Sequence, residues 1–329
     1  MKQSTDERYK SHCPPVLALL MLLVGFFLMA SPAKGEGGDK GEPFPRIHQI
    51  QGSPDSARVN AWVVEGKRSL ILVDTLLTTS DYAVLSKRLD SLGKPLKAVI
   101  ITHPHPDHYN NLATLLKRHP KTATYGAPSV IEAIRRDDPA QRRFWTPFYP
   151  GTYPEELAVP TRPLPTEGPM TIDDMTIDFL TLEKGEASTQ TILHIPAANA
   201  VITGDLVLNR VHPSFFGGNS AGWLAALDVL ERRFPEARRI LPGHGNAGGR
   251  ELIATQREYL RRLRDEIRKQ IDPDNDETPL SMKGFEEVNR KMLSEYPYDA
   301  GYNFGMIVRS VTDEIVSTMP KRTVEPFMY

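Results

Sequence analysis

Cysteine is almost absent from this chain of 329 residues, which contains a single one, Cys13, close to its start. Disulfide bonds therefore cannot hold the fold together. Any metal site beyond residue 13 has no thiolate ligand, and no cysteine nucleophile is available there. The chain also has no internal repeat and no long low-complexity tract, and it is long enough to bury one large α/β core.

A strong net charge is absent too, because 40 lysine and arginine residues balance 41 aspartate and glutamate residues to give a formal net charge of −1. This balance gives no reason to expect attraction to nucleic acid. Arginines recur at helical spacing within residues 250–270, but Glu258, Asp265 and Glu266 lie among them, which is typical of a solvated helix face. We expect a small-molecule substrate and no nucleic-acid partner, and the sequence leaves the oligomeric state open.

The first 33 residues have the pattern of a secretory signal peptide. Three basic residues precede an uncharged run over residues 14–30, and Ser31-Pro-Ala33 is a small-x-small cleavage pattern. Cleavage there would remove three basic and two acidic residues, change the net charge from −1 to −2 and leave no cysteine. We therefore expect a periplasmic or secreted protein with a flexible leader over residues 34–45. If the segment stays uncleaved, it would act as a membrane anchor instead.

Three histidines and a carboxylate lie close together in the segment Thr102-His-Pro-His-Pro-Asp-His108. The segment follows the apolar, β-branched run 98–101, which predicts a buried strand, and α/β folds place their sites at such strand ends. Pro104 and Pro106 fix their φ angles, so we expect a stiff loop and not a helix. Imidazole and carboxylate suit zinc and its first-row neighbours. The predicted metal ligands of this segment are His103, His105, Asp107 and His108.

Strands and helices alternate along the chain, which predicts a layered α/β fold. We expect strands at 61–64, 69–73, 98–101, 122–125 and 239–241, hairpins at 170–182 and 191–203, and helices at 80–92, 111–118, 130–136 and 250–270. Residues 139–168 are rich in proline and aromatic residues and predict a long ordered loop, which either covers the substrate or packs on the sheet edge. Residues 46–250 are the expected main domain, and residues 251–329 a C-terminal helical extension packed on it.

Two further ligand-type residues follow short apolar strands, namely Asp205 in Gly204-Asp205 and His244 in Pro242-Gly-His-Gly245. The neighbouring glycines permit the close backbone approach that a buried metal site requires. Together with the histidine segment, these residues predict one site to which three strands contribute.

These motifs, with Asp74 after the strand at 69–73, resemble the metallo-β-lactamase superfamily over about residues 46–250. The resemblance implies a four-layered αββα sandwich of the α/β class with a pair of metal ions at one edge of its two sheets. It is specific for the fold and says little about the substrate.

The resemblance also assigns roles. It places His103 and His105 on the first metal and Asp107, His108 and His244 on the second, with Asp205 bridging both and Asp74 supporting the histidine segment. Members usually supply a third histidine to the first metal from a turn before the bridging aspartate, and that turn reads Gly185-Glu186-Ala-Ser188 here. Glu186 is therefore the expected ligand. The alternatives are that Glu186 only caps the turn and leaves the first site weak or empty, or that Glu183 replaces it.

A glutamate at this turn changes the charge of the site. Three ligand carboxylates and a bridging hydroxide would balance two divalent ions, whereas the usual site stays positive. The exchange resembles the alkylsulfatase branch of the superfamily and shifts the metal preference somewhat toward manganese or iron. Two divalent ions, zinc before manganese or iron, are the expected cofactors.

The function that the resemblance implies is that of an exported binuclear zinc-dependent hydrolase. A metal-bridging hydroxide, oriented by Asp107 and Asp205, would attack an ester, lactone or β-lactam bond. Tyr109 and His212 are further candidate catalytic residues, which could meet a leaving group or an oxyanion. The alternatives are an alkylsulfatase-like sulfate ester or phosphodiester hydrolase, an iron-dependent oxidoreductase of the superfamily, and a non-catalytic metal-binding protein.

Overall fold

The computed structural model describes residues 44–213, 219–272, 275, 278–299, 301 and 304–319. The predicted signal peptide, residues 1–33, and residues 34–43 of the predicted leader lie outside these ranges. The described residues all belong to one compact unit. Within the described ranges, no helix is both long enough and apolar enough to span a membrane.

Six strands form the first sheet, in the order β1-β2-β3-β4-β5-β6. Antiparallel pairs join β1 (Arg46–Gln51), β2 (Asn60–Glu65) and β3 (Leu70–Val73), and parallel pairs add β4 (Leu96–Ile100), β5 (Ala123–Gly126) and β6 (Arg162–Pro163). Every residue of β2 and β3 is buried, because both faces of this sheet are covered. Burial on both faces explains why these strands have continuous apolar runs in place of alternation. The edge strands β1 and β6 were not predicted from the sequence.

Five strands form the second sheet, in the order β11-β10-β9-β8-β7. The antiparallel strands are β7 (Glu167–Ile172), β8 (Met175–Glu183), β9 (Thr189–Ile195) and β10 (Ala200–Leu208), and β11 (Arg239–His244) pairs parallel with β10. The pairs β7–β8 and β9–β10 are the two predicted hairpins.

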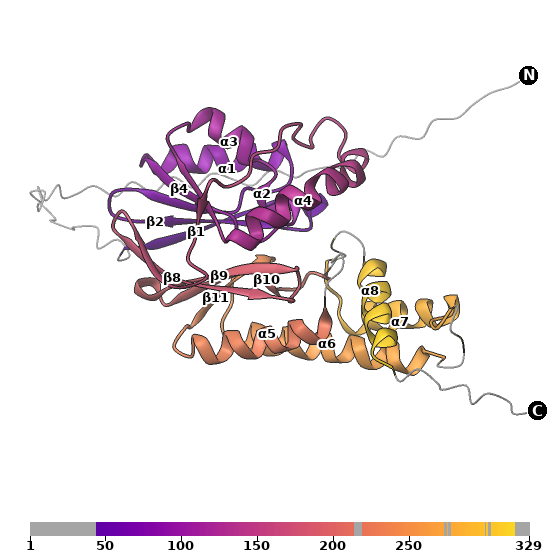
Figure 1. Ribbon diagram of the computed structural model, residues 1–329. Coiled ribbons are helices and arrows are strands. Elements are labelled where there is room, and N and C mark those ends of the chain that lie inside the picture. Colours follow the sequence, from indigo (N-terminus) through magenta and orange to yellow (C-terminus); the bar gives the residue numbers. More distant parts are fainter. Residues whose placement is uncertain are drawn as a thin grey trace, which may run out of the picture. The chain divides into compact units, whose positions relative to one another are not determined.

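Helices cover the outer face of each sheet (Figure 1). On the first sheet lie α1 (Thr79–Leu92), α2 (Pro106–Tyr109), α3 (Leu112–Arg118) and α4 (Pro128–Trp145), and on the second lie α5 (Ser220–Arg233) and α6 (Glu251–Gln270). Three apolar clusters fill the spaces between the helices and the first sheet, between the two sheets, and between the second sheet and its helices. The predicted four-layered αββα sandwich is confirmed.

The C-terminal helices extend the outermost layer. α7 (Met282–Glu295) and α8 (Phe304–Ser317) contribute Val288, Met292, Ile307 and Val311 to the apolar cluster that α6 shares with the second sheet. The C-terminal helices are therefore joined to the sandwich by a common core.

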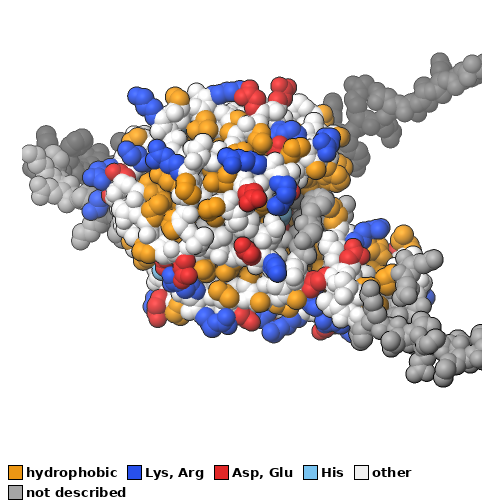
Figure 2. All heavy atoms as spheres, viewed as in Figure 1, with side chains coloured by type: hydrophobic (Ala, Val, Ile, Leu, Met, Phe, Trp, Pro, Cys, Tyr) orange, Lys and Arg blue, Asp and Glu red, His pale blue; other side chains and the backbone are white. Residues whose placement is uncertain are grey.

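The face seen in Figure 2 carries basic and acidic side chains intermixed.

The segment predicted as a long loop, residues 139–168, is helical at its start. α4 continues through Pro139 to Trp145, and the short 3-10 helix η2 (Thr146–Phe148) follows. A proline inside a helix removes one backbone hydrogen bond. Here Arg142 donates two side-chain hydrogen bonds to the buried Asp138, four residues earlier, which stabilises the turn that contains the proline. The loop prediction was wrong for residues 139–148.

Two strand ends also differ from the expectation. β10 continues beyond Asp205 to Leu208, and its register against β11 shifts on both sides of Gly204. Gly204 has a φ of 49°, in the left-handed region that glycine adopts without strain. The irregularity redirects the strand at Asp205, as a bulge does. In the histidine segment, Pro106 begins the one-turn helix α2, because proline is favoured in the first turn of a helix.

Candidate metal centre

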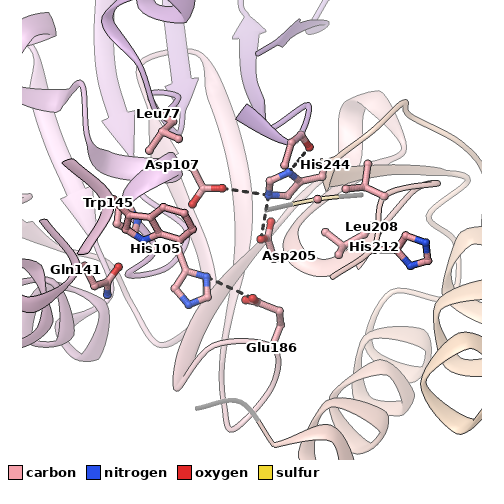
Figure 3. Close-up of a pocket in the computed structure, with 14 residues that line it drawn as sticks. Leu77, His105, Asp107, Gln141, Trp145, Glu186, Asp205, Leu208, His212 and His244 are labelled. Carbon is pink, nitrogen blue, oxygen red and sulfur yellow. Dashed lines mark hydrogen bonds and ion pairs between the residues drawn. The ribbon is translucent and has the colours of Figure 1, made fainter. Parts of the chain in front are cut away.

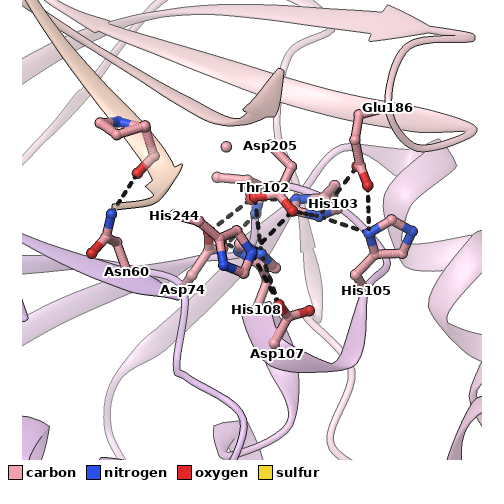
Figure 4. Close-up of polar contacts among 12 residues, drawn as sticks. Asn60, Asp74, Thr102, His103, His105, Asp107, His108, Glu186, Asp205 and His244 are labelled. Atoms are coloured by element: carbon pink, nitrogen blue, oxygen red, sulfur yellow. Dashed lines mark hydrogen bonds and ion pairs between the residues drawn. The ribbon is translucent and has the colours of Figure 1, made fainter. Parts of the chain in front are cut away.

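Seven histidine, aspartate and glutamate side chains meet at one edge of the two sheets (Figure 4). They come from the segment after β4, from α2, from the turn between β8 and β9, from β10 and from the end of β11. They form two groups, which are His103, His105, Glu186 and Asp205, and Asp107, His108, Asp205 and His244. The structure thus brings together all seven residues predicted as ligands, with Asp205 in both groups.

The first group is compact. His103 Nε2 lies 3.2 Å from His105 Nδ1, which lies 3.3 Å from Glu186 Oε1. His103 Nε2 also lies 3.8 Å from Glu186 Oε2 and 3.7 Å from Asp205 Oδ2. Two imidazole nitrogens and two carboxylates therefore surround one common volume, as the ligands of a zinc-type ion do.

The second group has similar spacing. His244 Nε2 lies 3.2 Å from Asp107 Oδ2 and 3.2 Å from Asp205 Oδ2. His108 Nε2 lies 3.2 Å from Asp205 Oδ1 and 3.6 Å from Asp107 Oδ2. The Asp205 carboxylate thus faces three histidines. Its Oδ2 lies near His103 and His244 and its Oδ1 near His108, an arrangement that a residue bridging two ions requires.

Asp205 can reach both groups because the neighbouring strand β11 has no side chain beside it. A Cβ atom at Gly243 would lie 1.8 Å from Asp205 Oδ1 and 2.8 Å from the carbonyl carbon of Gly204. Contacts this short are impossible, so a glycine at 243 is required for Asp205 to lie in both groups.

Asp74 organises the histidine segment without joining either group. Its Oδ1 accepts a hydrogen bond from the Thr102 backbone N–H at 2.8 Å, and its Oδ2 accepts one from the Thr102 hydroxyl at 2.8 Å. His108 Nδ1 also lies 2.8 Å from Asp74 Oδ2, so this nitrogen donates to the carboxylate and Nε2 keeps its lone pair for a metal. Asp74 has a φ of 63°, a strained conformation that is typical of functional sites.

His244 is held in a comparable way. Its Nδ1 lies 2.7 Å from the carbonyl oxygen of Ala57 and can only donate to it. His244 Nε2 therefore faces Asp107 and Asp205, and its lone pair becomes available to a metal ion when the proton on Nε2 is lost. Nothing in the sequence points to Ala57, and Thr102 stands out only by its place directly before His103.

Burial and neighbouring charges shift the pKa values of the two groups in different directions. Burial and the nearby His108 lower the pKa of His103 well below its ordinary value. Burial and the nearby Asp205 raise the pKa of Glu186 well above its ordinary value. Burial alone would lower the pKa of His244, but Asp205 and Asp107 outweigh it and raise the value to about 10. Without metal, the first group is therefore largely neutral and the second is held by opposite charges. A bound cation would replace the protons.

The residues present fit a pair of metal ions. His108 Nε2, Glu186 Oε2 and Asp205 Oδ1 are buried and have no hydrogen-bond partner. Buried polar atoms are normally satisfied, and all three of these atoms belong to the two groups. Four imidazoles and three carboxylates suit two divalent ions of the zinc, manganese or iron kind.

A pocket opens beside the two groups and encloses about 530 Å³ of space, part of it open to solvent (Figure 3). His105, Asp107, Glu186, Asp205 and His244 form its polar floor. The remaining described walls are mainly apolar, and they include Leu77, Trp145, Leu208 and Val211. Among the described residues that line this pocket, none is lysine or arginine.

Gln141 and Trp145 of α4 line the pocket as well. They lie in the segment 139–168, which was predicted either to cover the substrate or to pack on the sheet edge. This part of the segment does form a wall of the pocket, although as a helix and not as a loop.

Two predicted catalytic residues do not face the ligand groups. Tyr109 is fully buried in the apolar cluster beneath α1 and α3, where its hydroxyl donates to Asp138 Oδ1 at 3.0 Å. It lies outside the residues that line the pocket, because the one-turn helix α2 directs it into the core, so we withdraw the expectation that it meets a leaving group.

His212 does line the pocket, but on the far side of Leu208 from Asp205 (Figure 3). Its Nδ1 lies 2.8 Å from the Tyr259 hydroxyl, and burial lowers its pKa to about 4. The ring is therefore largely neutral near pH 7. A hydrogen bond from His212 to a substrate stays a prediction.

Comparison with known proteins agrees with this geometry. Residues 56–244, more than half of the chain, match the metallo-beta-lactamase superfamily, and the chain belongs to that family. The metallo-beta-lactamase type 2 of Bacteroides fragilis is 23% identical over 198 residues, which are 59% of this chain and 72% of that enzyme.

Two sulfatases are similar in part. The alkyl/aryl-sulfatase BDS1 of Saccharomyces cerevisiae is 38% identical over 74 residues, which are 22% of this chain and 11% of the yeast protein. A solved structure of a double mutant of the sec-alkyl sulfatase PisA1 superposes with a TM-score of 0.60 at 18% identity, covering 84% of this chain and 50% of that one. The chain thus spans 50% of the PisA1 structure and 11% of the yeast sulfatase. The likeness to the solved structure establishes the fold alone.

Proposed function

We propose that this protein is an exported binuclear metal-dependent hydrolase, with zinc as the first metal to test, that cleaves uncharged carboxylic esters or lactones. The observation that carries the proposal is a pair of ligand groups sharing Asp205 at the floor of a pocket whose described walls lack lysine and arginine. Membership of a family of metallo-hydrolases supports the reaction class.

In this proposal the first group holds one ion and the second group holds the other. When bound, divalent ions lower the pKa of water and polarise a substrate oxygen. The chain itself supplies orientation: Asp74 fixes His108, and the Ala57 carbonyl fixes His244. Asp107 lines the pocket and also belongs to the second group, so its carboxylate is placed to accept a hydrogen bond from a reacting water.

The charge of the pocket favours an uncharged substrate. Asp107, Glu186 and Asp205 offset most of the charge that two divalent ions bring. A sulfate ester, a phosphodiester or the carboxylate of a β-lactam antibiotic calls for a cationic partner, and the described walls offer none. We therefore rank esters and lactones before β-lactams.

A sulfate ester hydrolase is the second candidate. It is favoured by Glu186 in the first group, since the alkylsulfatase branch also uses glutamate ligands, and by the local likeness to the yeast sulfatase. The lack of a cationic wall residue places it after the esters.

The test is metal analysis of purified protein followed by a chromogenic panel of esters, lactones, β-lactams, sulfate esters and phosphodiesters. We expect two metal ions per chain and turnover of esters or lactones that His103→Ala and Asp107→Ala abolish. Turnover that survives both substitutions would reject the mechanism. A single iron with oxygen consumption would indicate an oxidoreductase, and two ions without any turnover a metal-binding protein.

Export is tested separately. Fractionation of the cells that produce the full chain should recover the protein in the periplasm or the medium, with a mature N-terminus close to residue 34. Recovery of the uncleaved chain with the membrane would instead indicate an anchored protein.

A further inference from the structure

A second hollow, which we name the aromatic groove, lies next to the metal pocket. It is formed by Phe144 and Trp145 at the end of α4, Phe148 of η2, the following Tyr149, and Met306 of α8. It encloses about 640 Å³ of space, part of it open to solvent.

The aromatic side chains pack on one another and leave apolar surface in contact with water. The ring centroids of Phe144 and Trp145 lie 5.0 Å apart, and those of Phe144 and Phe148 lie 5.4 Å apart. Phe144 is nevertheless 45% exposed and Phe148 63% exposed. The Tyr149 hydroxyl donates to the backbone oxygen of Asp55 at 2.8 Å, which fixes this end of the cluster. A fixed and exposed apolar patch of this kind indicates a binding surface.

The groove adjoins the metal pocket. Trp145 and Gly301 line both hollows. On the pocket side, the walls beyond the ligand groups are formed by apolar residues such as Leu77 and Leu208. The only charged side chain among the described residues that line the groove is that of Asp55, which would repel an anionic substituent.

We propose that the aromatic groove binds the apolar alkyl or aryl substituent of the ester whose hydrolysis is proposed above, an inference that rests on that function. The ester group would lie over the ligand groups, and its substituent would pass Trp145 toward Phe144 and Phe148. The substrate class is therefore an uncharged ester with a long apolar substituent, and short acetyl esters are poor substrates.

The first test is a series of p-nitrophenyl esters from acetyl to decanoyl, with zinc-loaded, full-length protein. Each methylene that enters the groove should raise kcat/KM by up to about fourfold, and mainly through KM. The double variant Phe144→Ala/Phe148→Ala should lose most of this dependence and keep its activity on the acetyl ester. Leu293→Ala is the matched control, because Leu293 is 46% exposed on α7 and lines neither hollow. It should keep the full dependence on chain length.

The second test measures binding without hydrolysis. Of the three tryptophans, Trp62 and Trp223 are 2% and 0% exposed, so Trp145 is the one that a ligand in the groove can contact. Titration of the zinc-loaded protein with 1-decanol should give a saturable change in tryptophan fluorescence. Trp145→Phe should remove this signal. The double variant Phe144→Ala/Phe148→Ala should weaken the binding of 1-decanol at least about tenfold.

The two tests separate the failure of this inference from that of the proposed function. If decanol binds as described but no ester is cleaved, the groove is supported and the esterase function fails. If esters are cleaved at rates independent of chain length and decanol does not bind, the inference is overturned and the esterase function stands. If the wild type is a dimer that the double variant dissociates, while decanol binding is unchanged, the surface is a contact between copies and the inference is also overturned.

Discussion

The two ligand groups differ in how firmly the fold holds them. In the second group, His108 Nδ1 donates to the Asp74 carboxylate and His244 Nδ1 donates to the Ala57 carbonyl, so both imidazoles have a fixed acceptor. In the first group, His103 Nδ1 donates to the Thr102 hydroxyl and so reaches Asp74 only through that hydroxyl, and the His105 side chain is 15% exposed. The comparison indicates that the second site is the more preorganised and the first the more easily emptied.

The largest effect is expected where the two groups meet. Asp205→Asn removes the charge shared by both sites, so both should lose metal and kcat/KM should fall by more than about a thousandfold. Metal analysis and ester kinetics measure this, with circular dichroism to confirm the fold. Retention of two ions at full activity would show that Asp205 is no bridge.

A smaller effect is expected from the support of the second group. Asp74→Ala removes the acceptor of His108 Nδ1 and of the Thr102 backbone N–H and hydroxyl, but no proposed ligand. Metal affinity and activity should fall about 10–100-fold. In a competition with a chelator, both sites should lose affinity and the second should lose more, because His108 contacts Asp74 directly and His103 contacts it only through Thr102. The order of loss in the wild type, first ion before second, should therefore be reversed. An unchanged order of loss would mean that Asp74 does not cause the difference between the groups.

The first group is tested by Glu186. Glu186→Ala should leave one ion per chain, held by the second group, and lower kcat/KM about tenfold or more, because the remaining ion still polarises substrate. Glu186→His should restore two ions. Two tightly bound ions in the alanine variant would assign Glu186 to the turn alone.

Local patterns explain what the sequence predicted well. The histidine segment follows β4, and Asp205 and His244 lie in the apolar strands β10 and β11, so strand and ligand could be located together. Glu186 was found by its place in a known turn. Each of these inferences depends on neighbours within a few residues.

The features that the sequence did not predict depend on distant contacts. The carbonyl of Ala57 is 187 residues from His244, and nothing in the sequence relates the two. α4 continues through Pro139 with the help of a side-chain bond to a buried aspartate, which local propensity does not include. Tyr109 points into the core because α2 turns it away from the pocket, although it follows a ligand directly.

The smallest effect on catalysis is expected from a substitution of Glu266. This substitution tests whether a general loss of stability has the same effect on metal binding as damage to a ligand group. The Glu266 side chain is 2% exposed and pairs with Lys269 and with Lys291 of α7. Burial alone would raise the pKa of Glu266, but these lysines and Arg262 outweigh it and lower the value. Because the folded pKa is lowered, this stabilisation is complete above the ordinary glutamate pKa of about 4.3 and is lost as the pH falls through the lower folded value.

Glu266→Gln should therefore reduce the free energy of unfolding by about 1–2 kcal/mol at pH 7 and by less below about pH 4. Denaturant unfolding at both pH values measures this difference. The variant should keep two metal ions and its kcat/KM at pH 7, because Glu266 belongs to neither group. If it lost metal from the first group alone, the weakness of that group would reflect overall stability rather than its own poorer support.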